Sequence, residues 1–141
     1  MHRFSHVAVT VGADQLDGAT RAELLQFYRE VFGWSENPSL AIPRQRLFLR
    51  APSDTQYITI RSSESPMRTS GYEHLGLLVE SETELRAIHQ RAAALASQLP
   101  DLELQPIQTE YGDVLLTFRL RFRLPLAIEV QYQRKEARSS A

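Results

Sequence analysis

The chain has 141 residues, of which 43% are hydrophobic and 9% aromatic, as is usual for one globular domain or two small modules that share a core. Its 16 basic and 17 acidic side chains give a formal net charge of −1, which provides no overall field for nucleic acid or an anionic membrane. There is no cysteine, so disulfides, thiolate metal ligands and a cysteine nucleophile are excluded. Any bound metal would have nitrogen and oxygen ligands, and neither nucleic acid nor a membrane is an expected partner.

The sequence also lacks the hallmarks of a membrane or exported protein. No stretch reaches the roughly 18 apolar residues that a spanning helix needs, and no long apolar run precedes the first strand. We therefore expect a soluble, cytoplasmic protein. The polar tail, residues 133–141, shows no periodicity and is expected to be a frayed end.

The first half of the chain predicts a strand, a helix and then two or three strands. Phe4–Val11 (FSHVAVTV) is the first strand. Over residues 19–33 apolar residues recur at spacings of three and four, which predicts an amphipathic helix that ends at Gly33. Two short alternating segments, Arg46–Pro52 and Gln56–Arg61, follow on either side of a Pro-Ser-Asp turn signal.

The second half repeats this order after a segment of linker composition, residues 62–71. The predicted elements are a strand at Tyr72–Val79 (YEHLGLLV), a helix from Ser81 as N-cap to Leu99, and strands at Leu102–Ile107, Val114–Phe122 and Leu126–Gln131. The prediction is one α+β domain over residues 1–141. It contains two tandem βαβββ modules, at about 4–61 and 72–132, related as a pseudo-twofold pair.

A histidine occupies the same place in the first strand of each module. FSHVAVTV and YEHLGLLV share the pattern aromatic, polar, His, apolar, small, apolar, any residue, Val. Alternation along the strands places His6, His74 and, in the last strand, Glu129 on the face that the helices do not cover. Two imidazoles and a carboxylate hold a divalent first-row metal while leaving coordination positions open. The alternative is that each histidine lies near a strand end and only hydrogen-bonds a backbone carbonyl or water. The repetition of the histidine at equivalent positions favours metal binding.

The sequence resembles the vicinal oxygen chelate superfamily, which includes glyoxalase I, extradiol ring-cleaving dioxygenases, fosfomycin-resistance proteins and bleomycin-binding proteins. The resemblance covers about Phe4–Tyr132 and rests on FSHVAVTV, LLQFYREVFGW, YEHLGLLV and the final IEV, in this order and spacing. It implies that the paired modules form a curved mixed sheet, an open barrel with the helices on its outer face. It also implies a metal held by first and last strands, which places His6, His74 and Glu129 at metal positions.

Two departures from the family pattern bear on function. Glyoxalase-like members usually carry a fourth ligand, commonly Glu, on the last strand of the first module, where this chain has Thr59. Three protein ligands resemble the dioxygenase arrangement more, with Fe(II) or Mn(II) as the expected metal and Zn, Ni or Co as alternatives. The segment Phe122–Pro125 (FRLP) replaces the Asp-Pro-x-Gly hairpin frequently seen before the final strand.

Further polar residues share the predicted cleft face. Tyr57, which could act as an acid or base, and Arg61 are the candidate catalytic residues. Thr59, Arg119 and Arg121 are candidate substrate-binding residues, since guanidinium groups pair with carboxylates or phosphates in a bidentate manner. The alternatives are a solvated face for the arginines and simple packing for Tyr57. His2 and His89 are assigned no role.

The first functional hypothesis is a metal-dependent enzyme whose small-molecule substrate chelates the metal through adjacent oxygens. Oxygen-dependent, dioxygenase-like chemistry is favoured, and isomerisation, epimerisation and metal-assisted addition stay open. The alternative is a metal-free protein that sequesters a drug or metabolite, as bleomycin-binding relatives do, through Tyr57, Phe48 and Trp34. A third hypothesis, a purely structural or regulatory member, has no feature in its favour. A homodimer is expected, because a chain of two such modules would expose an edge of the barrel.

Overall fold

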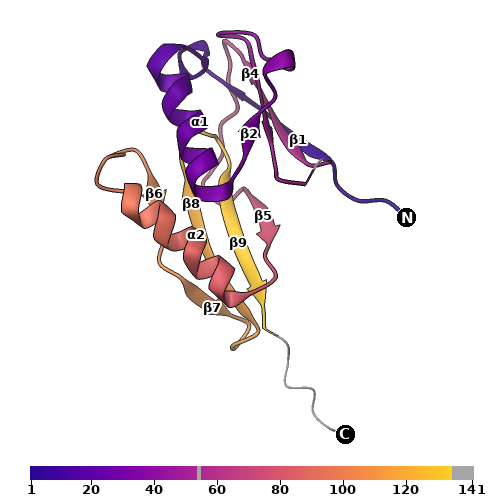
Figure 1. Cartoon of the computed structure of the whole chain (residues 1–141), viewed down its shortest axis with the longest axis vertical. Coiled ribbons are helices and arrows are strands. Elements are labelled where there is room, and N and C mark those ends of the chain that lie inside the picture. The colour runs from indigo at the N-terminus through magenta and orange to yellow at the C-terminus, as the bar shows by residue number, and fades with distance from the viewer. Residues whose placement is uncertain (54, 135–141) are drawn as a thin grey trace, which may run out of the picture. The chain divides into compact units, whose positions relative to one another are not determined.

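The computed structural model describes residues 1–53 and 55–134, and contacts divide them into two compact units (Figure 1). Unit 1 comprises Met1–Thr69 with Arg123–Pro125, and unit 2 comprises Ser70–Phe122 with the chain from Leu126 onward. Of the tail predicted to be frayed, residues 135–141 lie outside the described residues, and for the other two the prediction is wrong, because Gln133 belongs to the last strand and Arg134 is hydrogen-bonded. In the described part of the chain no helix is long and apolar enough to cross a membrane.

Unit 1 contains the elements predicted for the first half of the chain. They are β1 (His6–Val11), the 3-10 helix η1 (Ala13–Leu16), α1 (Gly18–Phe32), β2 (Ser35–Glu36), the 3-10 helix η2 (Pro38–Leu40), β3 (Arg46–Arg50) and β4 (Tyr57–Ser62). The strands form a mixed sheet in the order β1-β4-β3-β2, in which only β1 and β4 are parallel. Gly33 ends α1 as predicted, because its φ of 73° is left-handed and its N–H donates to the Arg29 carbonyl at 2.9 Å.

The core of unit 1 follows the predicted alternation. Val9 and Val11 of β1 are buried, whereas His6 and Ala8 are exposed. The buried apolar side chains from the other elements are Leu16, Leu24, Phe27, Tyr28, Val31, Trp34, Leu47, Leu49, Ile58 and Ile60. Burial of these side chains stabilises the unit by removing apolar surface from water and leaves the opposite face of β1 free for polar residues.

Unit 2 repeats this plan, and its two longest strands have seven residues each. Its elements are β5 (His74–Leu78), α2 (Glu82–Leu95), β6 (Glu103–Leu104), β7 (Gln108–Glu110), β8 (Leu115–Arg121) and β9 (Ala127–Gln133). The sheet order is β5-β9-β8-β6, with β7 also paired to β8, and only β5 and β9 are parallel. Figure 1 shows α2 running alongside β8 and β9. Two mixed sheets with few helices confirm the α+β prediction.

Two predicted boundaries in unit 2 are wrong. The second helix ends at Leu95 and not Leu99, because residues 96–98 form tighter turns in which Ala96 and Gln98 bond carbonyls three residues back. Of the strand predicted at Leu102–Ile107 only β6 forms, since Pro106 has no N–H to donate to β8, and the next strand, β7, begins beyond the predicted range at Gln108.

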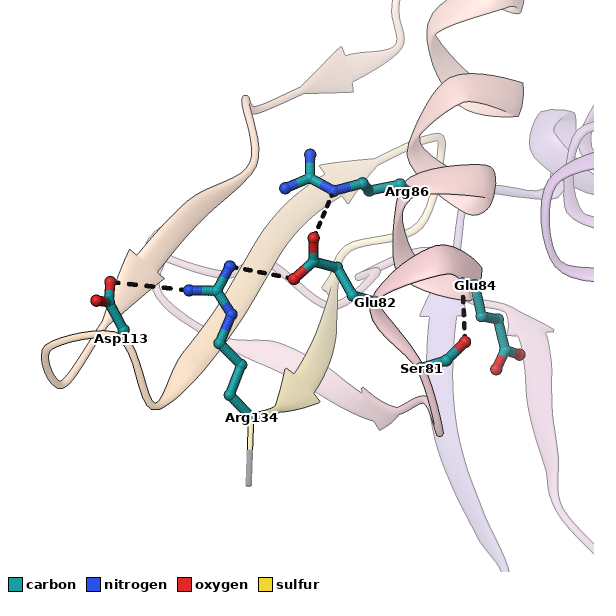
Figure 2. Close-up of polar contacts among 6 residues, drawn as sticks. All are labelled: Ser81, Glu82, Glu84, Arg86, Asp113 and Arg134. Carbon is teal, nitrogen blue, oxygen red and sulfur yellow. Dashed lines mark hydrogen bonds and ion pairs between the residues drawn. The ribbon is translucent and has the colours of Figure 1, made fainter. Parts of the chain in front are cut away.

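The start of α2 is tied to the end of β9 (Figure 2). Ser81 caps the helix as predicted, its Oγ accepting from the Glu84 N–H at 3.1 Å. The Glu82 carboxylate receives Arg86 Nε at 3.0 Å and Arg134 Nη2 at 3.1 Å. Hydrogen bonds from Arg86 and Arg134 lower the pKa of Glu82. These contacts anchor the last described residue of the chain to the first turn of the helix.

Candidate functional site

The parallel strand pair of each unit has the same register around its histidine. In unit 1, His6 lies opposite Tyr57 and Ala8 opposite Thr59. In unit 2, His74 lies opposite Ala127 and Gly76 opposite Glu129. Thr59 and Glu129 therefore occupy matching positions, each opposite the small residue two places after the histidine. This register agrees with the correspondence inferred from the sequence.

The structure brings His74 and Glu129 together. His74 Nε2 lies 3.3 Å from Glu129 Oε2. His74 Nδ1 lies 2.7 Å from the carbonyl oxygen of Tyr72, and since a carbonyl can only accept, Nδ1 carries a proton and donates it. In a neutral imidazole the lone pair is then on Nε2 and directed at the carboxylate; in an imidazolium, Nε2–H pairs with it. A fixed tautomer of this kind is typical of metal-ligating histidines.

Glu129 is held on both of its oxygens. Its residue is 3% exposed, Arg119 Nε donates to Oε2 at 2.7 Å, and Gln131 Nε2 donates to Oε1 at 2.5 Å. Burial raises the pKa of Glu129, but the hydrogen bonds from Gln131 and Arg119, with the charges of Arg119 and His74, outweigh it and leave the pKa below its ordinary value. Glu129 is therefore ionised near neutral pH and available as an oxygen ligand.

Tyr72 and Gln131 were not predicted as site residues. Tyr72 supplies the carbonyl that orients His74, presents its ring to the His74 imidazole in a T-shaped contact at 5.7 Å, and lies under the Arg119 guanidinium, also at 5.7 Å. Gln131 follows Glu129 by two residues on the same strand, so parity could have identified it. The role of Tyr72 could not be predicted in this way, because its acceptor is a backbone carbonyl, which every residue has.

His74 Nε2 and Glu129 Oε2 are separated by a distance that two adjacent ligands of one metal would also have. With ligand distances of about 2.1 Å and angles near 90°, adjacent donor atoms lie roughly 3 Å apart, close to the observed 3.3 Å. Gly76, opposite Glu129, has no atom within 4 Å of where a Cβ would lie, which leaves space beside the carboxylate. The donors fit a metal, but two do not complete a site. Within residues 1–53 and 55–134 no group of three His, Cys, Asp or Glu side chains is placed to hold a metal ion.

The matching face of unit 1 is aromatic and cationic. The His6 imidazole stacks on the Tyr57 ring at 4.8 Å with an interplanar angle of 4°, and its Nδ1 lies 2.8 Å from Ser5 Oγ. Tyr57 contacts Phe48 at 5.7 Å, and the Arg46 guanidinium lies 5.8 Å from the centre of the Phe48 ring. We call His6, Tyr57 and Phe48 the aromatic ladder of unit 1.

The other predicted site residues differ in their surroundings. Thr59 is half-buried on β4 and Arg61 is exposed on the same strand. Arg119 is engaged with Glu129, whereas Arg121 Nε lies 3.3 Å from Glu103 Oε2 without hydrogen-bond geometry and is a buried donor with no hydrogen bond among the described residues. Of the two β8 arginines, only Arg119 therefore contacts the carboxylate of the site.

Solved structures share this fold. The protein is similar to a mutant of the fosfomycin resistance protein FosX from Listeria monocytogenes, solved with Mn(II) and 1S,2S-dihydroxypropylphosphonic acid: 18% identity, 96% of this chain and 94% of that chain covered, TM-score 0.66. It is also similar to a possible glyoxalase from Bacillus cereus, with 20% identity, 92% of this chain and 98% of that chain covered, and a TM-score of 0.64. A third similar structure is a glyoxalase/bleomycin resistance protein from Albidiferax ferrireducens T118, with 20% identity, 93% of this chain and 98% of that chain covered, and a TM-score of 0.62. No protein-family model matches the sequence. No curated protein matches it either.

These similarities define the class of fold. The protein has the α+β fold of the glyoxalase/bleomycin resistance and FosX structures, in agreement with the fold class predicted from its sequence.

Proposed function

We propose that the protein is a metal-dependent enzyme whose small-molecule substrate binds a divalent metal through two adjacent oxygens. His74 Nε2 and Glu129 Oε2 are the proposed ligands in unit 2, and His6, at the equivalent position of unit 1, is the proposed third. The observation that carries the proposal is the 3.3 Å approach of His74 Nε2 to an ionised carboxylate, with the tautomer fixed by the Tyr72 carbonyl.

The metal would act as a Lewis acid that stabilises an oxyanion on the substrate. Fe(II) or Mn(II) is proposed from the nitrogen and oxygen ligand set, with Zn, Ni and Co as alternatives. FosX from Listeria monocytogenes, which shares the fold, was solved with Mn(II). Because this set contains three ligands and Thr59 replaces a fourth, dioxygenase-like chemistry is favoured.

The chain's own residues would orient the substrate and handle its protons. Arg119 lies beside Glu129 and offers a guanidinium to an anionic group of the substrate. Tyr57 is proposed as the acid or base, and Arg61 shares its strand face. Thr59 and Arg121 are proposed as further substrate contacts. Each of these roles predicts that substitution lowers turnover more than it lowers metal content.

The test is the metal content of the anaerobically purified protein, measured by elemental mass spectrometry. We expect about one Fe, Mn, Ni, Co or Zn per chain, lost in His74→Ala and in Glu129→Ala. His2→Ala is the matched control, because His2 is exposed and has no assigned role. If the wild-type protein holds no stoichiometric metal, even after Fe(II) or Mn(II) is added to the apoprotein, the enzyme proposal is wrong.

A second candidate function, metal-free binding of a planar molecule, is supported by the aromatic ladder of unit 1. Stacked rings next to arginines suit a flat ligand that carries negative charge. Trp34, expected to contribute, is instead buried against Tyr28 and Phe32. Calorimetric binding of planar aromatic carboxylates that survives EDTA and is lost in Tyr57→Ala would support this function over the first.

A further inference from the structure

We infer that Arg119 makes the metal site bind its metal and a small oxyanion cooperatively, each strengthening the binding of the other. The inference rests on the proposed metal site and adds to it a regulatory role for a residue that touches only one of the ligands.

Arg119 and His74 both contact the same oxygen of Glu129, Oε2. Arg119 lies directly opposite Glu129 in the β8–β9 pair, and its Nε donates to Oε2 at 2.7 Å. The same Oε2 faces His74 Nε2 at 3.3 Å, whereas Oε1 is occupied by Gln131. A metal bound between His74 and Glu129 would therefore coordinate the oxygen that already carries the guanidinium.

Charge makes this arrangement unfavourable for a metal alone. Without metal, the carboxylate and the guanidinium neutralise each other. A divalent ion would leave two cationic groups on one oxygen, in a site where Glu129 is 3% exposed and the Arg119 side chain 25% exposed. Charges at such distances repel more strongly there than in bulk water. Arg119 thus weakens metal binding until an anion compensates its charge.

Arg119 also has the means to recruit that anion. A guanidinium has five N–H donors, and among the described residues the hydrogen bond to Glu129 uses only Nε–H. The remaining donors, on Nη1 and Nη2, form the fork that pairs with a carboxylate or phosphate. The Tyr72 ring covers one face of the guanidinium, and the Arg119 side chain remains 25% exposed, so a solute can reach it.

Coupling of this kind is reciprocal. If the anion raises the affinity for metal by some factor, the metal raises the affinity for the anion by the same factor, typically about 5-fold to 150-fold. A rival explanation gives Arg119 only a positioning role, because ligating carboxylates are commonly hydrogen-bonded. The two explanations predict opposite effects of removing the Arg119 charge on metal affinity.

The experiment is a titration of the full-length apoprotein with Mn(II), in which the electron paramagnetic resonance signal reports free Mn(II). It is run without added anion, with inorganic phosphate and with acetate, each corrected by a protein-free titration. The variants are Arg119→Gln, Arg119→Lys and, as matched control, Arg86→Gln, which removes an arginine that pairs with Glu82 on the surface of α2.

We expect phosphate or acetate to tighten Mn(II) binding by wild type and Arg86→Gln about tenfold, a coupling in the usual range. Arg119→Gln should bind Mn(II) more tightly than wild type without anion and change less than about twofold when anion is added. Arg119→Lys, which keeps the charge, should retain the weak anion-free affinity and so guards against a misfolded Gln variant.

Two results would overturn the inference in distinguishable ways. If wild type binds Mn(II) with an affinity that anions do not change, or if Arg119→Gln binds it more weakly, Arg119 only positions Glu129 and the metal site itself stands. If wild type binds no Mn(II) under any of these conditions, the coupling is wrong, and the proposed metal site is wrong as well if the purified protein also holds no stoichiometric Fe, Mn, Ni, Co or Zn.

Discussion

Thr59 occupies in β4 the register position that Glu129 occupies in β9, each opposite the small residue that follows a histidine by two places in the parallel neighbour strand. The two modules thus match in backbone pairing and differ in one ligand-bearing side chain. That difference separates the three-ligand set proposed for this protein from a four-ligand set.

Thr59→Glu is expected to tighten metal binding. The new carboxylate would lie next to His6 within unit 1, as Glu129 lies next to His74 within unit 2. An added anionic ligand should raise Mn(II) affinity by roughly tenfold, which corresponds to about 1.4 kcal/mol. The measurement is Mn(II) titration by calorimetry, with Thr59→Gln as a control of the same length. Equal affinities for the two variants would show that the register match has no bearing on the metal.

Glu129→Gln is expected to lower the free energy of unfolding near neutral pH. It should also make that free energy depend less on pH in the acidic range. The pKa of Glu129 is lower in the folded chain than in the unfolded chain. Its stabilisation is therefore present above the ordinary glutamate pKa and lost as pH falls through the folded value. We expect a loss of about 1.5–3 kcal/mol at pH 7, the usual contribution of hydrogen bonds to a charged group.

The measurement is urea unfolding in EDTA-containing buffer from pH 7 to pH 3, for wild type and Glu129→Gln. The two curves of unfolding free energy should converge as the pH falls. Parallel curves would mean that Glu129 takes up its proton at the same pH in the folded and unfolded chains.

Tyr28 is expected to make the fold labile in alkali. It is fully buried in unit 1, and burial raises the pKa of its hydroxyl far above 10. Because the folded chain keeps this proton when the unfolded chain releases it, stability is intact below about pH 10 and falls above it by up to about 1.4 kcal/mol per pH unit. Urea unfolding from pH 8 to pH 11 should show this slope, and Tyr28→Phe should reduce it. An unchanged slope in Tyr28→Phe would assign the alkaline loss to other groups.

Ser81→Ala is expected to destabilise unit 2 by about 1 kcal/mol through loss of the helix N-cap. The hydroxyl that accepts the Glu84 N–H at 3.1 Å disappears and leaves this donor to water (Figure 2). Ser81→Asp, which keeps a capping oxygen, is the control and should stay close to wild type in thermal unfolding. Equal losses in both variants would place the effect outside the cap.

The protein is expected to form a homodimer. β1 and β5 lie at the edges of their sheets, and in the described part of the chain no strand pairs with their outer sides. Exposed edges present unpaired N–H and C=O groups that favour association with another strand. Light scattering at micromolar concentration should give twice the chain mass, and a monomeric mass would contradict the prediction.

The fold could be predicted because its determinants are local and repeated. The apolar period identified α1 and the inward face of β1, and Gly33 and Ser81 marked helix ends through backbone geometry and capping. The repeated histidine strands were sufficient to align the modules, and the observed register of β1 with β4 and of β5 with β9 agrees with that alignment.

The contacts of the candidate site could not be predicted in the same way. Alternation shows which face Arg119 and Arg121 share, but not that Arg119 pairs with Glu129 while Arg121 faces Glu103, because long side chains choose among several neighbours. The orientation of His74 depends on the Tyr72 carbonyl, a group that every residue possesses.

The interruption of the strand at Pro106, by contrast, could have been predicted from the sequence, since proline lacks the N–H that a strand donates to its neighbour.

The chain passes between its two units at 69/70, 122/123 and 125/126, so that residues 123–125 belong to unit 1 although their neighbours in sequence belong to unit 2. Within unit 1, Arg123 Nη2 donates to Glu23 at 2.6 Å and Thr69 Oγ1 donates to the Pro125 carbonyl at 2.6 Å. A fragment cut after Thr69 would lack these contacts. The two halves of the chain should consequently recover native structure when they are mixed as separate fragments. If the second module were replaced by the corresponding module of another protein, that module would have to supply a donor for Glu23 in place of Arg123.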